Sequence, residues 1–317
     1  MGDLPEMRVT PSRAFTHCGI DYAGFYNIKD GKSRTRTFIK CYLCIFVCLA
    51  TKAVHVELVT ELTSDAFMNA FKRRGLCKNI YTDNGTNFVG ANNELNKICK
   101  ILENLPNHSK YQSYFNENGV RWHFIPARSP HFGGMWEAAV KSFKQHIKRV
   151  VMDTSLTFED FYTVITQIEA VLNSRPLLPL SSDPSDLESL TPGHFLIGDA
   201  LLAVPQDDVT EIPTNRLSSY KKLQQMVQRF WRSWSNDYLN TLQQRSKWRQ
   251  NVNNIKIGTL VLLKEDNVPP MNWQLARVIG VHPGQDNLVR VVSVRTNNGV
   301  VRRAINKVCP LPESDLD

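Results

Sequence analysis

The chain has 317 residues, of which 42% are hydrophobic, and a formal net charge of +8. This length allows two or three domains with cores of their own, and the apolar content excludes a disordered chain. The longest apolar run, around Cys41 to Ala50, is too short to span a bilayer, and the first residues lack the apolar stretch of a signal peptide. We therefore expect no membrane partner and a cytosolic or nuclear setting.

The positive charge is concentrated in the last third of the chain. From Thr214 to Asp317 there are 16 Lys and Arg against 7 Asp and Glu, whereas the remainder holds 22 against 23. A polyanion such as nucleic acid is one explanation for this segment, and a basic surface that only aids solubility is the other. Charge alone does not separate the two.

Sequence periodicity predicts mixed α/β structure in the first half of the chain. Strands are expected within residues 15–26, 35–59 (two strands joined at Thr51-Lys52), 77–83 and 120–126. Helices are expected within residues 63–75, 90–104, 134–153 and 157–175. Thr63 and Ser64 are candidate caps for the first of these helices, and Pro176 stops the last.

The second half of the chain contains three segments with different predicted structure. Residues 177–214 are rich in Pro, Ser and Asp and predict an irregular connection, followed by a basic helix with interleaved aromatics at 215–248. For Trp231 and Trp234, core packing is the more common role than stacking on bases. From Ile255, short strands separated by turn residues predict a small β-barrel of about 60 residues.

Seven cysteines do not form a disulfide framework. Cys41 and Cys44 form a C-x-x-C pair, but their neighbours are apolar and a strand would point them to opposite faces. We therefore expect buried core cysteines rather than a zinc site.

Three acids stand in apolar or small surroundings at the ends of predicted elements. Asp21 lies inside a short strand, Asp83 ends another, and Glu137 opens a helix. Taken singly, Asp83 also fits a turn and Glu137 fits a helix N-terminus, whereas Asp21 has no turn role. A carboxylate in such surroundings is costly to desolvate unless it is paired or binds a metal. Together the acids predict a site for one or two Mg²⁺ ions, which prefer carboxylate and phosphate oxygens.

Lys141, Lys144 and Lys148 follow Glu137 at intervals of four, seven and eleven residues, so they share its face of the helix. An acid followed by lysines on one face is typical of a helix that lies along a phosphate backbone. The alternative is an ordinary Glu–Lys pair on a solvated face.

The stretches GIDYAG, YTDNGTNFVG and HFGGMWEAAVKSFKQHI carry the three acids in order. Sixty-one residues separate Asp21 from Asp83, and 53 separate Asp83 from Glu137. In these blocks the chain resembles the catalytic core of D,D-35-E-type integrases, and it is most similar to integrases of the BEL/Pao class of LTR retrotransposons. Residues 171–198, 229–248 and 269–312 also fit this class.

The resemblance implies an α/β fold with an RNase H-like core, which has a five-stranded mixed sheet and flanking helices. A helical basic segment and a small SH3-like all-β barrel would follow. It implies Mg²⁺ or Mn²⁺ held by Asp21, Asp83 and Glu137, with no small-molecule cofactor. The activity implied is that of a polynucleotidyl transferase, which processes the 3′ end of the element's DNA and joins it to target DNA. The residues expected to contact nucleic acid are Asn84, Lys141, Lys144 and Lys148.

Domain bounds follow from these blocks: a lead-in at 1–14, the catalytic core at 15–176, an irregular connection with basic aromatic helices at 177–250, and a nucleic-acid-binding barrel at 251–313. Gly133 and Gly134 match the family's mobile catalytic loop. We expect element and target DNA as partners, a homo-oligomer, and a nuclear location with cytoplasmic passage.

Integrases of this kind carry a zinc module ahead of the core, and the 20 residues before Asp21 show no such pattern. A fragment, a degraded copy and a domesticated gene therefore stay open. So do two other functions: a catalytically inactive DNA-binding protein derived from an integrase, and an RNase H-like nuclease that acts on another nucleic acid.

Overall fold

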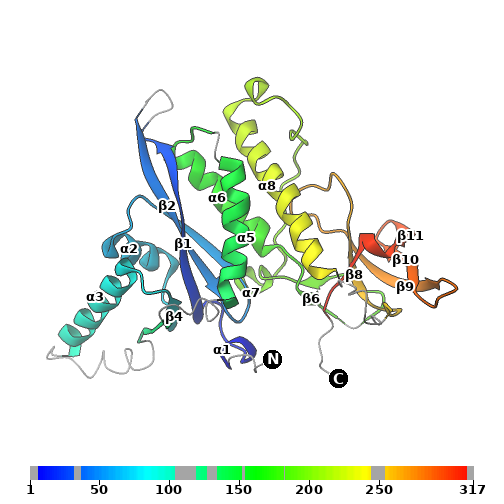
Figure 1. Cartoon of the computed structure of the whole chain (residues 1–317), viewed down its shortest axis with the longest axis horizontal. Coiled ribbons are helices and arrows are strands. Elements are labelled where there is room, and N and C mark those ends of the chain that lie inside the picture. Colours follow the sequence, from blue (N-terminus) through cyan, green and yellow to red (C-terminus); the bar gives the residue numbers. More distant parts are fainter. Residues whose placement is uncertain are drawn as a thin grey trace. The chain divides into compact units, whose positions relative to one another are not determined.

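The computed structural model describes residues 6–31, 37–103, 119–126, 134–151, 154–181, 183–243 and 254–312. The chain divides into two compact units, Met1–Glu169 and Ala170–Asp317. Figure 1 shows their elements in chain order. In the part of the chain that is described, no helix has the length and apolar character needed to cross a membrane.

The first unit is built on one mixed sheet. Its strands are β1 (His17–Lys29), β2 (Phe38–Cys48), β3 (Val54–Val59), β4 (Asn79–Thr82) and β5 (Arg121–Phe124), in the order β3-β2-β1-β4-β5. The first three strands pair antiparallel, and β4 runs parallel to both β1 and β5. This five-stranded mixed sheet, with helices on both faces, fits the RNase H-like core that the resemblance implies.

The helices of this unit confirm most of the predicted positions. They are α1 (Glu6–Val9), α2 (Ser64–Arg74), α3 (Thr86–Glu103), α5 (Gly134–Val151) and α6 (Phe158–Asn173), which runs on past the unit boundary. Thr63 caps α2, because its hydroxyl accepts a hydrogen bond from Ala66 N at 3.1 Å. Gly75 ends the helix with a φ of +90°, which a residue with a side chain rarely adopts.

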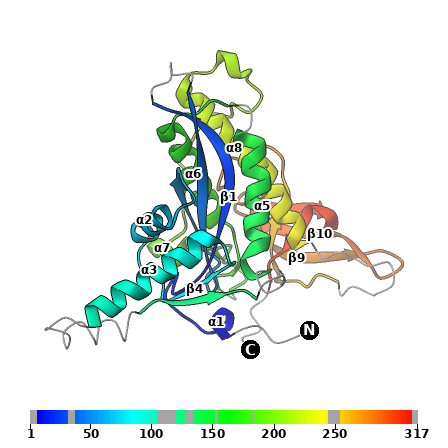
Figure 2. The ribbon, with the colours of Figure 1, turned by 60° about the vertical axis from the view of Figure 1, so that its left-hand side comes forward.

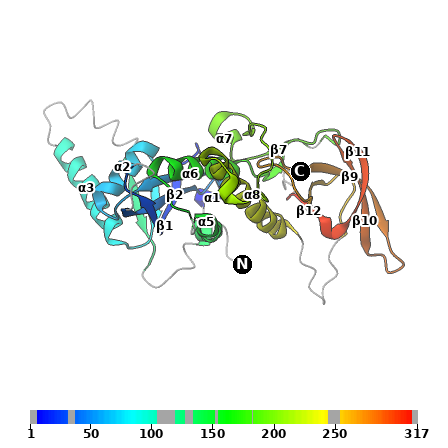
Figure 3. The ribbon, with the colours of Figure 1, turned by 90° about the horizontal axis from the view of Figure 1, so that it is seen from above.

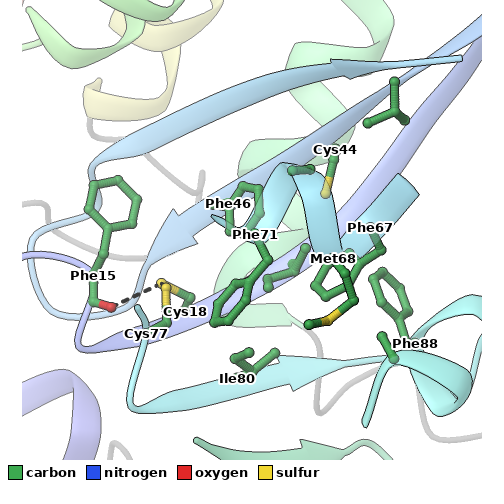
Figure 4. Packing of buried hydrophobic residues seen from close by; sticks show 14 of the residues in the cluster. Phe15, Cys18, Cys44, Phe46, Phe67, Met68, Phe71, Cys77, Ile80 and Phe88 are labelled. Carbon is green, nitrogen blue, oxygen red and sulfur yellow. Dashed lines mark hydrogen bonds between the residues drawn. The ribbon is translucent and has the colours of Figure 1, made fainter. Parts of the chain in front are cut away.

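One face of the sheet forms the hydrophobic core of the unit (Figure 4). Residues from β1, β2 and β4 pack there against the buried side of α2 and the start of α3. Phe67 of α2 is fully buried and meets Phe88 of α3 edge-to-face, with ring centroids 5.2 Å apart. Cys18 and Cys44 are buried in this cluster, which confirms core cysteines.

The opposite face of the sheet is covered by α5, which lies alongside β1 (Figure 2). Trp136 of α5 is buried, and its ring lies 6.4 Å from that of Tyr81 at the end of β4. Tyr26 of β1 packs against Phe161 of α6 with ring centroids 5.5 Å apart and the ring planes tilted by 60°. Thus the two faces of β1 serve different purposes: one fills the core, and the other faces α5 and α6.

A buried charge cluster fastens the edge strand β3. The Glu169 carboxylate of α6 accepts hydrogen bonds from Val56 N at 2.8 Å and from His55 Nδ1 at 3.1 Å. His55 Nε2 also lies 3.1 Å from Glu57, which pairs with Arg73 of α2 at 2.6 Å. Burial alone would lower the pKa of His55, but the hydrogen bonds and charges of Glu169 and Glu57 outweigh it and raise that pKa to about 9.

This cluster predicts a pH-dependent stability. Because the pKa of His55 rises from 6.5 unfolded to about 9 folded, its contribution is complete below pH 6.5 and is lost as the pH rises through 9. The upper limit is about 3 kcal/mol, from 1.36 kcal/mol for each pKa unit. Urea unfolding of wild type and His55→Gln should show a difference in unfolding free energy that shrinks between pH 6.5 and 9.5. A difference that does not change with pH would contradict the assignment.

The second unit begins with short elements and one long helix. The first part contains β6 (Leu178–Pro179), β7 (Ser189–Leu190), α7 (His194–Ile197), η2 (Thr214–Arg216) and α8 (Ser219–Leu242). Phe230, Trp231 and Trp234 of α8 are buried, which confirms that these aromatics pack in a core. Gln225 Nε2 donates to the carbonyls of Val209 and Ile212 at 2.7 Å, so α8 also holds the irregular segment before it.

The unit ends in an all-β sheet (Figure 3). Its elements are β8 (Leu260–Leu263), β9 (Leu275–Pro283), β10 (Val289–Thr296), β11 (Gly299–Ala304), η3 (Ile305–Lys307) and β12 (Val308–Pro310), and the strand order is β11-β10-β9-β8-β12. All four pairings are antiparallel. The predicted all-β segment is therefore present, while its SH3-like form stays a prediction.

Candidate active site

Asp21 and Asp83 belong to neighbouring parallel strands. The register of β1 and β4 pairs His17 with Asn79 and Gly19 with Tyr81. If this register continued for two residues beyond the last pair of the ladder, Asp21 would stand opposite Asp83, which directly follows the last residue of β4. The pairing of β1 with β4 therefore makes neighbours of two strands that are far apart in the sequence, one holding Asp21 and the other leading into Asp83.

Asp21 belongs to the α5 side of the sheet. Side chains alternate along a strand, so Asp21 points to the same side as Gly19, and within β4 Tyr81 is on that side. A Cβ placed on Gly19 would lie 2.5 Å from the Trp136 ring, and Tyr81 also contacts that ring. Gly19 therefore allows α5 to approach β1 closely, next to Asp21.

The Asp21 carboxylate is half-buried and engaged on both oxygens. Its Oδ2 accepts a hydrogen bond from Lys144 Nζ of α5 at 2.7 Å, and its Oδ1 accepts one from Tyr22 N at 2.6 Å. The ion pair confirms that Lys144 shares the face of α5 that looks toward the acids. It also marks the Asp21 oxygen as one that attracts a cation.

Asp83 combines a turn role with its position at the site. Its Oδ1 accepts a hydrogen bond from Gly85 N at 3.0 Å, which shapes the turn between β4 and α3. The carboxylate remains exposed to solvent. Asn84 turns the other way, because its Nδ2 donates to the carbonyl of Ile125, after β5, at 2.8 Å. That bond fixes the turn relative to β5 and leaves the nucleic-acid role of Asn84 a prediction.

Glu137 lies in the first turn of α5, one residue after Trp136. Because Trp136 packs over Gly19 and Tyr81, the helix backbone brings residue 137 to the same part of the sheet. The Glu137 side chain is outside the described part of the structure, and so is Gly133 of the predicted catalytic loop. The third acid is therefore placed by its backbone alone.

The donor set of the site fits a divalent cation. Mg²⁺ and Mn²⁺ are hard cations that take carboxylate oxygens, and two of the three expected ligands come from β1 and from the end of the adjacent strand β4. Among the side chains that are described, no group of three or more His, Cys, Asp and Glu gathers to hold a metal. The expected site would need Glu137 as well as Asp21 and Asp83.

The predicted lysines of α5 differ in their surroundings. Lys144 pairs with Asp21, Lys148 is exposed and lines a groove beside β1, and Lys141 is exposed on the helix. Sequence reasoning placed all three on the face of Glu137 but missed the close packing of Gly19 on Trp136. The signal was a glycine inside a strand, which often marks a close approach.

The C-terminal sheet offers a separate basic surface. Arg295 of β10 and Arg302 of β11 are exposed on the side opposite the buried Val292 and Val294. Arg303 pairs with Glu265 at 2.8 Å. Exposed arginines on a sheet can contact phosphates, and a polyanion partner for this segment stays a prediction.

Residues 218–311 match a family model described as "Family of unknown function (DUF5641)", which covers α8 and the C-terminal sheet. No curated protein matches the chain. A solved structure that it resembles is a chain of the cryo-EM structure of the simian T-cell lymphotropic virus intasome in complex with PP2A regulatory subunit B56 gamma. That match has 11% identity, covers 98% of this chain and 84% of the other, and has a TM-score of 0.37. A TM-score this low supports no argument about function.

Proposed function

We propose that this chain is an integrase of a retroelement, a metal-dependent polynucleotidyl transferase that processes and joins DNA ends. The observation that supports the proposal is the pairing of β1, which holds Asp21, with β4, which leads into Asp83, together with the contact between Asp21 and Lys144 of the helix that also holds Glu137. A turn or a helix N-terminus would explain one of these acids alone. Neither would explain acids from separate, neighbouring elements.

Each residue has a part in this chemistry. Asp21, Asp83 and Glu137 would hold one or two Mg²⁺ or Mn²⁺ ions. When bound, such ions stabilise the negative charge that develops on a phosphate during in-line displacement. Lys144, which contacts Asp21, would exchange that contact for a phosphate oxygen of the DNA. Lys141 and Lys148 on the same helix would bind flanking phosphates, and Asn84 would lie beside the DNA.

The wider proposal follows the resemblance in the sequence. The element would belong to the BEL/Pao class, the partners would be element ends and target DNA, and the chain would act as a homo-oligomer in the nucleus. The exposed arginines of the C-terminal sheet support nucleic-acid binding by the second unit. Affinity from such contacts falls with salt, since each one releases counterions from the DNA.

The experiment uses labelled short duplex DNA with Mn²⁺ or with EDTA. We expect shortened 3′ ends and longer joined products with Mn²⁺ and none with EDTA, while binding persists in both. Binding without products in Mn²⁺ would favour a DNA-binding protein without catalysis. Products that form equally in EDTA would reject the metal-dependent mechanism.

A further inference from the structure

A groove opens beside β1 within the first unit, directly beyond the Lys144–Asp21 pair. Its volume is about 790 Å³, and Lys144 and Lys148 of α5 line one side of it. Phe25 of β1 and Phe38 at the start of β2 also line it. Among the residues that the structure describes, the groove is lined by these two lysines and by no acid, which suits an anion.

A β-bulge in β1 creates the aromatic side of this groove. Gly24 pairs with Tyr42, and Tyr26 pairs with the adjacent Cys41, so Phe25 is an extra residue without a partner on β2. The bulge reverses the alternation of side chains, which lets the Tyr26 ring pack against Phe161 of α6. Phe25 is left 54% exposed only a few residues after Asp21.

A cation–π contact with Lys40 holds the Phe25 ring in position. Lys40 Nζ lies over it at 4.6 Å from the centroid, a cation–π contact that covers one face of the ring. Phe38 is 49% exposed in the same groove. Two half-exposed aromatic rings next to lysines are a costly surface to leave in water. The rings match the bases of a single strand, and the lysines match its phosphates.

We propose that this groove binds the unpaired end of a DNA strand as it leaves the acid site. Bases stack on Phe25 and Phe38, and phosphates between them bind Lys148 and Lys144. A duplex buries its base faces by stacking and exposes only phosphates, sugars and base edges, so the aromatic pair selects single-stranded DNA. This inference rests on the proposed function for its place in the reaction, and its binding test is independent of catalysis.

The test measures fluorescence anisotropy of a labelled oligothymidine of about ten nucleotides, in EDTA. Phe25→Ala and Phe38→Ala should each weaken this binding by roughly five- to a hundredfold, the usual loss for one stacked base. Binding of a blunt duplex should change by less than about twofold. Melting curves confirm that each variant is folded.

Two controls separate stacking from general damage. Phe158 of α6 is 44% exposed and lies outside the groove, so Phe158→Ala should bind the oligomer as wild type does. An oligomer with abasic sites keeps its phosphates but has no bases. Wild type and Phe25→Ala should bind it equally.

The salt dependence of oligomer binding tests the role of the lysines. For single strands, each phosphate contact contributes about 0.7 to the slope of log affinity against log salt. Lys148→Ala should lower the slope by about that amount. Lys72→Ala, an exposed lysine in the last turn of α2, should leave it unchanged.

The outcomes are decisive in both directions. Oligomer binding that is as strong in Phe25→Ala and Phe38→Ala as in Phe158→Ala overturns the proposal, and so does an equal loss of duplex binding. If these variants behave as expected but wild type forms no product with Mn²⁺, the groove stands as a nucleic-acid site and only the enzymatic function fails.

Discussion

An Asp83→Asn protein should lose cleavage and joining of DNA by at least about a thousandfold. A metal held by carboxylates supplies several kcal/mol of charge stabilisation, and each 1.36 kcal/mol is a tenfold change in rate. The amide of asparagine is a poor ligand for a hard cation, yet its oxygen still accepts the hydrogen bond from Gly85 N that shapes the turn. The fold and the DNA affinity should therefore survive.

The measurement compares initial rates on labelled duplex DNA with Mn²⁺, together with binding in EDTA. Asp65→Asn is the matched control, because Asp65 is an exposed acid in the first turn of α2, away from β1 and β4. It should react as wild type does. Equal rates for Asp83→Asn and Asp65→Asn would reject the assigned acid.

Gly19→Ala should disturb both stability and activity. The added methyl group would lie 2.5 Å from the Trp136 ring, which is closer than real atoms approach, so α5 or the indole has to move. Overpacking of this kind costs about 2 kcal/mol, or roughly 4–8 °C in Tm. Because Glu137 and Lys144 sit on the same helix, we expect DNA cleavage to fall further than stability alone explains.

A double-mutant cycle of Gly19→Ala with Trp136→Leu tests this contact. The smaller side chain relieves the contact, so the double variant should be less destabilised than the sum of the two single changes. Gly280→Ala in β9 is the matched strand glycine, since its added methyl would lie at an ordinary 3.6 Å from Ser293. If Gly19→Ala melted at the same temperature as Gly280→Ala, α5 would not lie this close to β1.

Local sequence signals predicted the parts of the site that depend on neighbours along the chain. The apolar run before Asp83 and the turn residues after it predicted a strand end, and β4 ends at Thr82. The spacing of the α5 lysines predicted their shared face, and Lys144 does look toward Asp21. Such features follow from the periods of strands and helices alone.

Features that depend on distant partners were missed. The bulge at Phe25 arises from how β1 pairs with β2, and the sequence GIDYAGFY does not predict a residue without a partner on the neighbouring strand. His55 and Glu169 are 114 positions apart, so their bond could be found only in the folded chain. The close approach at Gly19 similarly needed Trp136, from a helix more than a hundred residues away.

Locating Mn²⁺ by anomalous scattering in crystals of the protein tests the central claim most directly. We predict a peak roughly 2 Å from carboxylate oxygens of both Asp21 and Asp83, with Glu137 completing the ligands and Lys144 displaced from Asp21. A peak bound elsewhere, or Lys144 still paired with Asp21 and no peak at saturating Mn²⁺, would contradict the account.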